Sequence, residues 1–331
     1  MNGWRKFQVK KIVVIHTGGT ISMHVHSESG AVITGDSNPI TAEIDKLKEY
    51  ADIHEIEAFN FPSPHITPKE MFAIKEIIDQ QIAAGKVEGF VITHGTDTLE
   101  ETAYFLDLTV NSDIPIILTG AMRSSNEIGA DGVYNLLSAV RVAIAQDAFR
   151  KGVLVVMNDE IHIEQHGTKT ATNKVSRYHS AEYGHIKIIT KTGVHFHHTP
   201  IRSDTFVLHE INKRVALLKV YAGMDADLLL HIANVGYDGI VLEGLGQGNV
   251  PPAIVQGIQQ LINQQIPVVL VSRCYNGIAQ PVYGYEGGGK MLEDMGVLFA
   301  HGLSGQKARI KLLIGLSDSH LIEPLSTWFK Y

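Results

Sequence analysis

Two short segments rich in threonine and glycine carry the side chains of this sequence that are best placed for nucleophilic chemistry. Residues 17–22 read TGGTIS and residues 94–98 read HGTDT, and each follows a short apolar run. An alcohol attacks well only when a neighbouring base removes its proton and a third group orients that base. The pattern therefore predicts a threonine nucleophile, without choosing between Thr20 and Thr96.

Asp97 and Lys169 are candidates for the two partners that such a threonine needs. Asp97 directly follows Thr96, and Lys169 lies in the sequence GTKT, shortly after the apolar run of residues 153–157. A lysine in a buried or cationic environment acts as a base near neutral pH. A single lysine in a loop is more often a solvated surface charge, and only its place after a strand makes Lys169 a candidate.

The elements that must position these residues alternate between apolar strands and amphipathic helices. The expected strands are residues 12–15, 53–59, 90–93, 115–118 and 152–157, and the expected helices are residues 41–49, 69–83 and 131–145, with another beginning near residue 98. Continuous apolar strands alternating with amphipathic helices are typical of parallel sheets covered on both faces. The carboxyl ends of parallel strands share one edge, where such sheets bind ligands.

Glycines, a helix-capping pattern and a polar loop indicate the local structure of the segments at that edge. Two glycines at positions 18 and 19 allow a tight turn with positive φ that holds a hydroxyl outward. Thr98 and Glu101 have the spacing of a capping box, and the helix start behind them favours a carboxylate or an oxyanion. Residues 24–38 are polar and aperiodic, so we expect an exposed loop of the kind that often acts as a lid.

The C-terminal part of the chain repeats the alternation on a smaller scale. Its expected strands are residues 215–221, 239–242 and 267–271, and its expected helices are residues 226–235, 252–264 and 306–314. We therefore expect an α/β fold of two α/β domains with mainly parallel sheets. The larger N-terminal domain would span residues 1–200 and carry the site, a linker would span residues 201–214, and the smaller domain would span residues 215–331.

Composition limits the classes of partner and compartment. The chain has 331 residues, 44% hydrophobic and 19% charged, with a formal net charge of -7, which gives no support for binding to nucleic acid or to an anionic membrane. One cysteine excludes an intramolecular disulfide. The first ten residues lack the apolar stretch of a signal peptide, and no apolar run approaches the roughly 20 residues of a membrane span. We expect a cytoplasmic protein.

Other motifs give weak support for alternative sites. Residues 244–249, GLGQGN, follow a strand but lack the spacing of a dinucleotide-binding loop, and no Gly-x-Ser-x-Gly serine elbow occurs. Histidines gather at positions 24 and 26, at 162 and 166, and at 195, 197 and 198. Because no His-Glu-x-x-His pattern accompanies them, we expect surface or loop imidazoles and no metal site.

Taken together, the two threonine segments resemble the paired signature motifs of the bacterial L-asparaginase/glutaminase family. The resemblance continues through residues 99–103, 237–241 and 246–249 and covers nearly the whole chain. It implies two α/β domains joined by a linker, assembled as a tetramer of close dimers. It also implies hydrolysis of L-asparagine to L-aspartate and ammonia through a covalent β-aspartyl ester, without a cofactor.

The resemblance also assigns roles to single residues. Thr20 would be the nucleophile, while Thr96, Asp97 and Lys169 would form a second catalytic group in which the lysine tunes a threonine hydroxyl. The positions implied to bind substrate are Gly19, Ser63, Thr96, Asp97, Ala121, Asn249 and Glu286, the last two approaching from a neighbouring subunit. Ser63 would bind the α-carboxylate, Asp97 the α-amino group, and the Ala121 carbonyl the amide.

Two positions depart from the family pattern, and three other functions stay open. Residues 24–38 contain no tyrosine, which the family lid usually carries, and Pro64 stands where glutamine is common after the α-carboxylate-binding serine. L-Glutamine differs from L-asparagine by one methylene, so a broader glutaminase-asparaginase is an alternative. An amidotransferase subunit and an amino-acid-binding sensor that has lost catalysis are the others.

Overall fold

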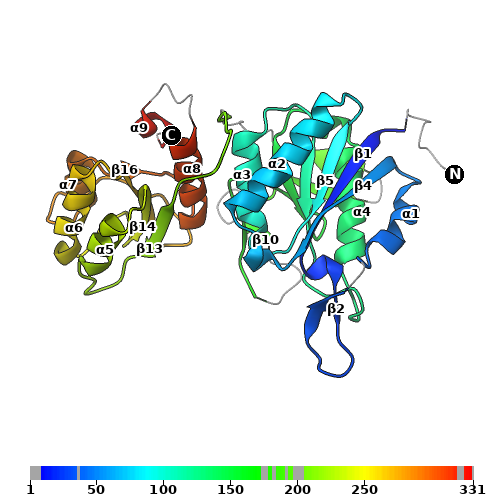
Figure 1. The fold of residues 1–331 in the computed structure, drawn as a ribbon, viewed down its shortest axis with the longest axis horizontal. Coiled ribbons are helices and arrows are strands. Elements are labelled where there is room, and N and C mark those ends of the chain that lie inside the picture. The colour runs from blue at the N-terminus through cyan, green and yellow to red at the C-terminus, as the bar shows by residue number, and fades with distance from the viewer. Residues whose placement is uncertain are drawn as a thin grey trace. The chain divides into compact units, whose positions relative to one another are not determined.

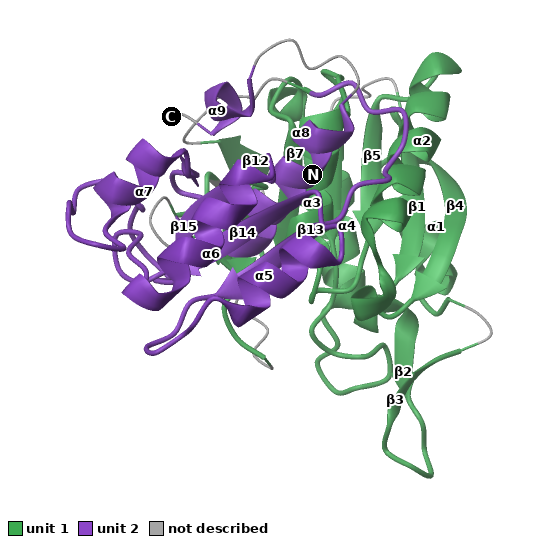
Figure 2. Ribbon diagram, turned by 60° about the vertical axis from the view of Figure 1, so that its left-hand side comes forward, with its two compact units in different colours: residues 1–205 green, residues 206–331 purple. Residues whose placement is uncertain are grey.

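The chain forms two compact units, residues 1–205 and residues 206–331, which Figure 2 colours separately. The computed structural model describes residues 9–35, 38–172, 178–180, 184–190, 193–196, 205–318 and 324–329. Residues 201–204 of the expected linker lie outside this part of the chain. Each unit has its own sheet, so the α/β architecture with two mainly parallel sheets is confirmed.

An eight-stranded sheet forms the centre of the first unit, in the order β12-β11-β8-β7-β6-β5-β1-β4. Its strands are β1 (Lys11–Gly18), β4 (Asp52–Phe61), β5 (Gly89–Thr93), β6 (Ile116–Thr119), β7 (Val153–Met157), β8 (Glu160–Ile163), β11 (Lys187–Thr190) and β12 (Gly193–Phe196). The pairs from β4 to β7 are parallel, whereas β8, β11 and β12 pair antiparallel. The strands β1, β5, β6 and β7 therefore end at one common edge.

Helices cover both faces of this sheet (Figure 1). Ile12 and Val14 belong to a buried cluster with α1 (Ile44–Leu47) and α4 (Gly132–Ala143). On the other face lie α2 (Pro68–Ala83) and α3 (Leu99–Thr109). Because both faces are covered, β1, β5 and β6 are buried along nearly their whole length, which explains their continuous apolar runs.

The direction of the chain reverses across the sheet between β1 and β5. From β1 the chain crosses to β4 on one side, and β5 then pairs with the other side of β1, with His16 opposite Thr93. Such a reversal opens a crevice beyond the carboxyl ends of the two strands, where open α/β sheets bind ligands. Both threonine segments emerge at this point.

Two small antiparallel ribbons lie outside the main sheet, one in the segment after β1 and one in the segment after β8. One pairs β2 (Met23–Val25) with β3 (Val32–Thr34), and the other pairs β9 (Gly167–Lys169) with β10 (Tyr178–Ser180). The expectation of an irregular loop over residues 24–38 is therefore wrong over the first ribbon. Its strands have three residues each and β3 is exposed, so they leave no buried alternation in the sequence.

The second unit has a four-stranded parallel sheet in the order β13-β14-β15-β16. Its strands are β13 (Val215–Lys219), β14 (Gly239–Gly244), β15 (Val268–Ser272) and β16 (Leu298–Phe299), and its helices are α5 (Asp227–Asn234), α6 (Pro252–Asn263), α7 (Gly289–Met295), α8 (Gly305–Ser317) and α9 (Leu325–Trp328). Leu229, Ile258 and Leu270 join one buried cluster. This unit is thus a second, smaller α/β body.

Several elements differ from the sequence predictions. The helix expected over residues 41–49 is a 3-10 turn, Thr41–Glu43, followed by the single-turn α1. The short elements α7, β16 and both ribbons were not predicted, because a stretch of two to seven residues carries too little periodicity. In the part of the chain that the structure describes, no helix is both long and apolar enough to span a bilayer.

Candidate active site

The two threonine segments meet through their glycines. Gly18 and Gly19 have φ values of 98° and 82°, a conformation that residues with a Cβ rarely adopt. A Cβ on Gly19 would lie 2.2 Å from the Gly95 Cα, so the two backbones touch with no room for a side chain between them. The turn after β1 and the turn after β5 are therefore in direct contact.

Thr20 starts a 3-10 turn, Thr20–Ser22, directly after this contact. Its side chain is half-buried, whereas Thr17 in the same segment is buried and its hydroxyl donates to the Thr93 carbonyl at 2.9 Å. The Thr17 hydroxyl is thus engaged within the sheet edge. Of the two threonines in TGGTIS, only Thr20 has a side chain partly accessible to solvent.

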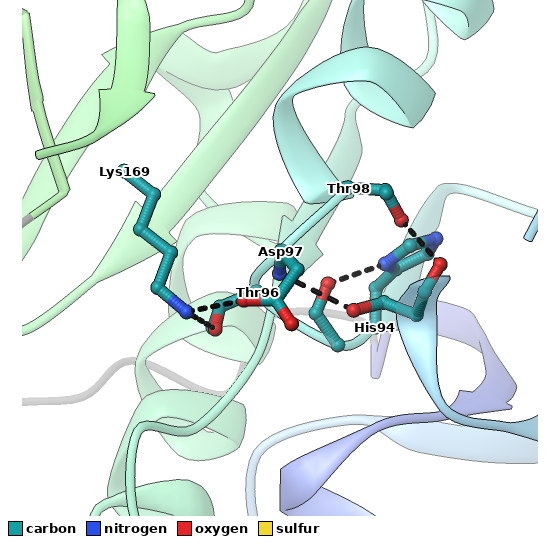
Figure 3. Close-up of polar contacts among 7 residues, drawn as sticks. His94, Thr96, Asp97, Thr98 and Lys169 are labelled. Carbon is teal, nitrogen blue, oxygen red and sulfur yellow. Dashed lines mark hydrogen bonds and ion pairs between the residues drawn. The ribbon is translucent and has the colours of Figure 1, made fainter. Parts of the chain in front are cut away.

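Thr96, Asp97 and Lys169 form one hydrogen-bonded group (Figure 3). The Lys169 Nζ donates to Thr96 Oγ1 at 2.9 Å and to Asp97 Oδ1 at 2.6 Å. The side chain of Lys169 is 19% exposed and that of Asp97 is 56% exposed, so the ion pair lies at the rim of the site while Thr96 is buried beneath it. The structure thus brings these three predicted residues together.

The ribbon of β9 and β10 delivers Lys169 to the threonine turns. Lys169 is the last residue of β9 and pairs with Tyr178 of β10. The Tyr178 ring packs on Gly167, where an added Cβ would lie 2.5 Å from the ring. The lysine is therefore held by a short strand, not by the free loop that the sequence indicated.

Ser63 links the loop after β4 to the turn after β5. Its buried Oγ accepts the Asp97 backbone N–H at 3.2 Å, and its carbonyl accepts the Thr98 hydroxyl at 2.8 Å. The predicted capping box at Thr98 is therefore wrong: Thr98 is at the N-cap position of α3, but its side chain makes no cap bond. The hydroxyl fixes the Ser63 backbone instead.

His94 lies fully buried beneath the Gly95 turn. Its Nδ1 lies 2.8 Å from the Gly95 carbonyl, which can only accept, so Nδ1 carries the proton and Nε2 accepts from the Thr102 hydroxyl at 3.0 Å. Burial lowers the pKa of His94 to about 4, outweighing the hydrogen bond to the Gly95 carbonyl. The imidazole is thus a neutral, doubly bonded support under the turn.

The lowered pKa of His94 predicts a loss of stability in acid. Between pH 6.5 and about 4 the unfolded chain binds a proton that the folded chain does not, so stability is full above pH 6.5 and falls as the pH drops. At about 1.4 kcal/mol per pH unit, this histidine alone accounts for a loss of about 3 kcal/mol at pH 4. Urea unfolding of the wild type and of His94→Gln at pH 7 and pH 4 measures it.

The His94→Gln protein should lose correspondingly less stability between the two pH values. His195→Gln, which removes an exposed imidazole on β12, is the matched control and should follow the wild type. Parallel pH profiles for the wild type and His94→Gln would contradict the prediction.

The remaining residues predicted to bind substrate are divided between the two units. Ala121 is buried in the loop after β6. Gly19 lies in the contact described above, and its N–H donates to the Phe61 carbonyl at 2.9 Å, so this N–H is already engaged. Asn249 and Glu286 belong to the second unit, where the Asn249 Oδ1 accepts the Gly289 N–H at 3.2 Å.

The expectation for His162 is also wrong. This histidine was expected on the surface or in a loop, but it is buried in β8, where Nδ1 lies 3.1 Å from the Ser180 Oγ and Nε2 lies 3.4 Å from Glu160. Burial lowers its pKa. Among the described residues, no group of three or more His, Cys, Asp or Glu side chains could hold a metal ion.

Supporting residues of the site escaped the sequence analysis. Asp131 and Asn135 at the start of α4 hold the loop after β6 through hydrogen bonds, and Gly95 and Gly120 allow close backbone approach. Gly95 and Gly120 could have been found from their position just after an apolar strand, the same position that drew attention to Gly18. No local signal marked Asn135, because its partners in the neighbouring loops, Gly120 and Asn158, are 15 and 23 residues away.

Known proteins resemble this chain over nearly its full length. Residues 11–202 match the family model described as asparaginase, N-terminal, and residues 214–329 match the glutaminase/asparaginase C-terminal domain. A Bacillus licheniformis protein named L-asparaginase is 34% identical over 310 residues, which cover 93% of this chain and 96% of the relative. A probable L-asparaginase of Deinococcus radiodurans is 36% identical over 318 residues, 93% of each chain.

A solved structure agrees in fold as well. The crystal structure of a probable cytoplasmic L-asparaginase from Campylobacter jejuni superposes with a TM-score of 0.86 at 30% sequence identity. The match covers 97% of this chain and 100% of that chain. The sequence similarity and the similarity in fold to these L-asparaginases therefore both extend over the two units.

Proposed function

This chain belongs to the asparaginase family, and from that premise we propose that it hydrolyses the side-chain amide of L-asparagine to L-aspartate and ammonia. The bond between Lys169 Nζ and Thr96 Oγ1, at 2.9 Å beside the turn of Thr20, carries the proposal. It pairs a threonine hydroxyl with an amine at the sheet edge where ligands bind.

In the first proposed step, Thr20 is acylated. Its Oγ attacks the amide carbon, the carbonyl oxygen becomes an oxyanion, and the C–N bond then breaks. The Thr20 proton moves to the leaving nitrogen through the Thr96 and Lys169 pair, so ammonia leaves and a β-aspartyl ester remains on Thr20.

Backbone N–H groups of the two turns stabilise the oxyanion in this mechanism. One preorganised donor of this kind contributes about 10²–10³ in rate. Because the Gly19 N–H is bonded to Phe61, we assign a donor role to the Thr20 N–H, the next along the turn.

In the second step, water hydrolyses the ester. A proton of the attacking water passes by way of Thr96, in contact with Lys169, to the Thr20 oxygen as the acyl C–O bond breaks and L-aspartate leaves. The Thr20 oxygen regains its proton, so the enzyme returns to its starting state with one amide and one water consumed.

Substrate orientation is assigned to residues around this centre. We propose that Ser63 binds the α-carboxylate, that Asp97 binds the α-amino group and that the Ala121 carbonyl contacts the amide. The Asp97 carboxylate is 56% exposed despite its bond to Lys169, so an ammonium group can reach it from solvent. A substrate lacking either α-group, or carrying it in the D-configuration, would lose these contacts.

A coupled ammonia assay with L-asparagine, L-glutamine and D-asparagine tests the proposal. We expect L-asparagine to exceed L-glutamine in kcat/KM by about 10- to 200-fold, the range for one methylene, and D-asparagine to fall below both. The Thr20→Ala protein supplies the background rate. Calorimetric binding of L-asparagine without ammonia release would replace this proposal by the sensor function, and equal rates with both L-amides would indicate a glutaminase-asparaginase.

We also propose a homotetramer of close dimers in the cytoplasm. In this assembly Asn249 and Glu286 of one subunit complete the site of a neighbour. The cytoplasmic location is supported by the single cysteine of the sequence, Cys274, which suits a reducing compartment. Relatives include a Haemophilus influenzae protein described as periplasmic, so compartments differ within the family. Light scattering should give four times the 36.3 kDa chain mass, and cell fractionation should place the activity in the cytoplasm.

A further inference from the structure

The loop after β6 adjoins both threonine turns. A Cβ on Gly120 would lie 2.4 Å from the His94 carbonyl oxygen and 3.2 Å from Thr96 Cγ2, so the Gly120 Cα faces the Thr96 methyl directly. Farther along the loop, Ser125 donates from its N–H and its hydroxyl to the Met23 carbonyl, at 3.0 and 2.9 Å. The loop thus touches Thr96 at one end and the segment after Thr20 at the other.

Asn135, on the first turn of α4, fixes the Gly120 end of this loop. Its side chain is 1% exposed. The Nδ2 donates to the Gly120 carbonyl at 2.9 Å and to Asp131 Oδ2 at 3.1 Å, while Oδ1 accepts the Asn158 N–H at 3.1 Å. One buried amide therefore joins the loop after β6, the start of α4 and the turn after β7.

Asp131 fixes the next two residues of the loop. Its carboxylate accepts the Met122 N–H at 3.0 Å and the Arg123 N–H at 3.0 Å. Asp131 occupies the N-cap position of α4 but makes no cap bond there. Because an N-cap aspartate ordinarily bonds its own helix, its engagement with the loop indicates that holding the loop is its main role.

We propose that Asn135 and Asp131 are positioning residues for the reaction, and this inference rests on the proposed amide hydrolysis. They hold Gly120 against the Thr96 methyl, and this contact selects the Thr96 rotamer whose hydroxyl faces Lys169. Threonine has three staggered χ1 wells, and only a rotamer with Oγ1 toward Nζ gives the 2.9 Å contact. The pair thus acts on the chemical step through Thr96 and does not touch the substrate.

Asn135→Asp is the informative substitution, because it keeps the shape of the side chain and removes both N–H donors. A carboxylate oxygen would then face the Gly120 carbonyl and the Asp131 carboxylate, and repulsion would move the loop. A displacement of about 1 Å at a catalytic group costs about 10²-fold in rate. We expect kcat for L-asparagine to fall about 100-fold, with KM within about threefold of wild type.

The double substitution Asp131→Asn/Asn135→Asp separates positioning from general stability. It restores an N–H donor between the two side chains, but the Gly120 carbonyl still lacks its donor. We expect the melting temperature to recover toward wild type while kcat stays low. Tyr134→Phe, on the same turn of α4, removes the exposed hydrogen bond to Asp159 without touching the loop after β6, and should leave kcat unchanged.

Two results would overturn the inference. One is a folded Asn135→Asp protein with wild-type kcat, and the other is recovery of kcat together with stability in the double variant. Either result leaves the proposed function intact, because that function is read from ammonia release by the wild type.

Discussion

Thr20→Ala is expected to lower the turnover of L-asparagine by at least about 10³-fold, because the covalent intermediate can no longer form. The methyl side chain keeps the volume near the Gly19–Gly95 contact but has no oxygen to form the ester. Ammonia release under saturating substrate measures the loss. Circular dichroism should show an unchanged fold, because the Thr20 side chain is half-buried and has no part in the sheet core.

Two matched variants make the Thr20 experiment specific. Thr17→Val removes the other hydroxyl of the same segment, which bonds the Thr93 carbonyl, and should cost about 1 kcal/mol of stability with little change in kcat. Thr20→Ser keeps an alcohol and should keep part of the activity. Wild-type turnover by Thr20→Ala would refute the assignment of Thr20 as the nucleophile. In a separate experiment, rapid acid quenching of the wild-type protein during turnover should reveal one aspartyl group bound to Thr20.

Lys169→Met should produce the second large loss, about 10²–10⁴-fold in kcat, the range for removing a positioned acid–base group. Methionine retains much of the aliphatic stem but cannot accept a proton or donate to Thr96. Lys69→Met, on the exposed side of α2, is the matched control for loss of one positive charge and should behave as wild type.

Lys169→Arg distinguishes proton transfer from charge alone. Arginine keeps the positive charge beside Asp97 but stays protonated at all working pH values. We expect Lys169→Arg to remain nearly as slow as Lys169→Met. Full activity of the arginine variant would show that the ion pair, and not proton transfer, is what the reaction requires.

Much of the architecture follows from local sequence signals. The apolar runs at β1, β5, β6 and β7 indicated buried parallel strands because each is covered on both faces, and the structure confirms this. Parallel strands end at a common edge, so the meeting of the two threonine turns also followed from the pattern. The fold class and the place of Thr96 and Asp97, which directly follow β5, needed no long-range information beyond this.

Other features depended on contacts that no local pattern encodes. The Thr98 hydroxyl bonds the Ser63 carbonyl, 35 residues away, instead of capping its own helix. His162 is buried because β8 pairs with β7 and places it opposite Val155. The ribbon that carries Lys169 consists of two three-residue strands, which are too short to show a period of two. In each case a distant partner outweighed the local preference.

The touching backbones of Gly19 and Gly95 limit how the specificity of this site can change during evolution or engineering. A single added methyl group has no space there, so the spacing of the two turns is set by main-chain atoms and is inherited unchanged. New substrates must therefore be accommodated through the segments that surround this fixed centre, the loop of Ser63, the loop of Gly120 and the β9 ribbon. A mutant library confined to those three segments should yield altered amide preference far more often than one directed at the glycine turns.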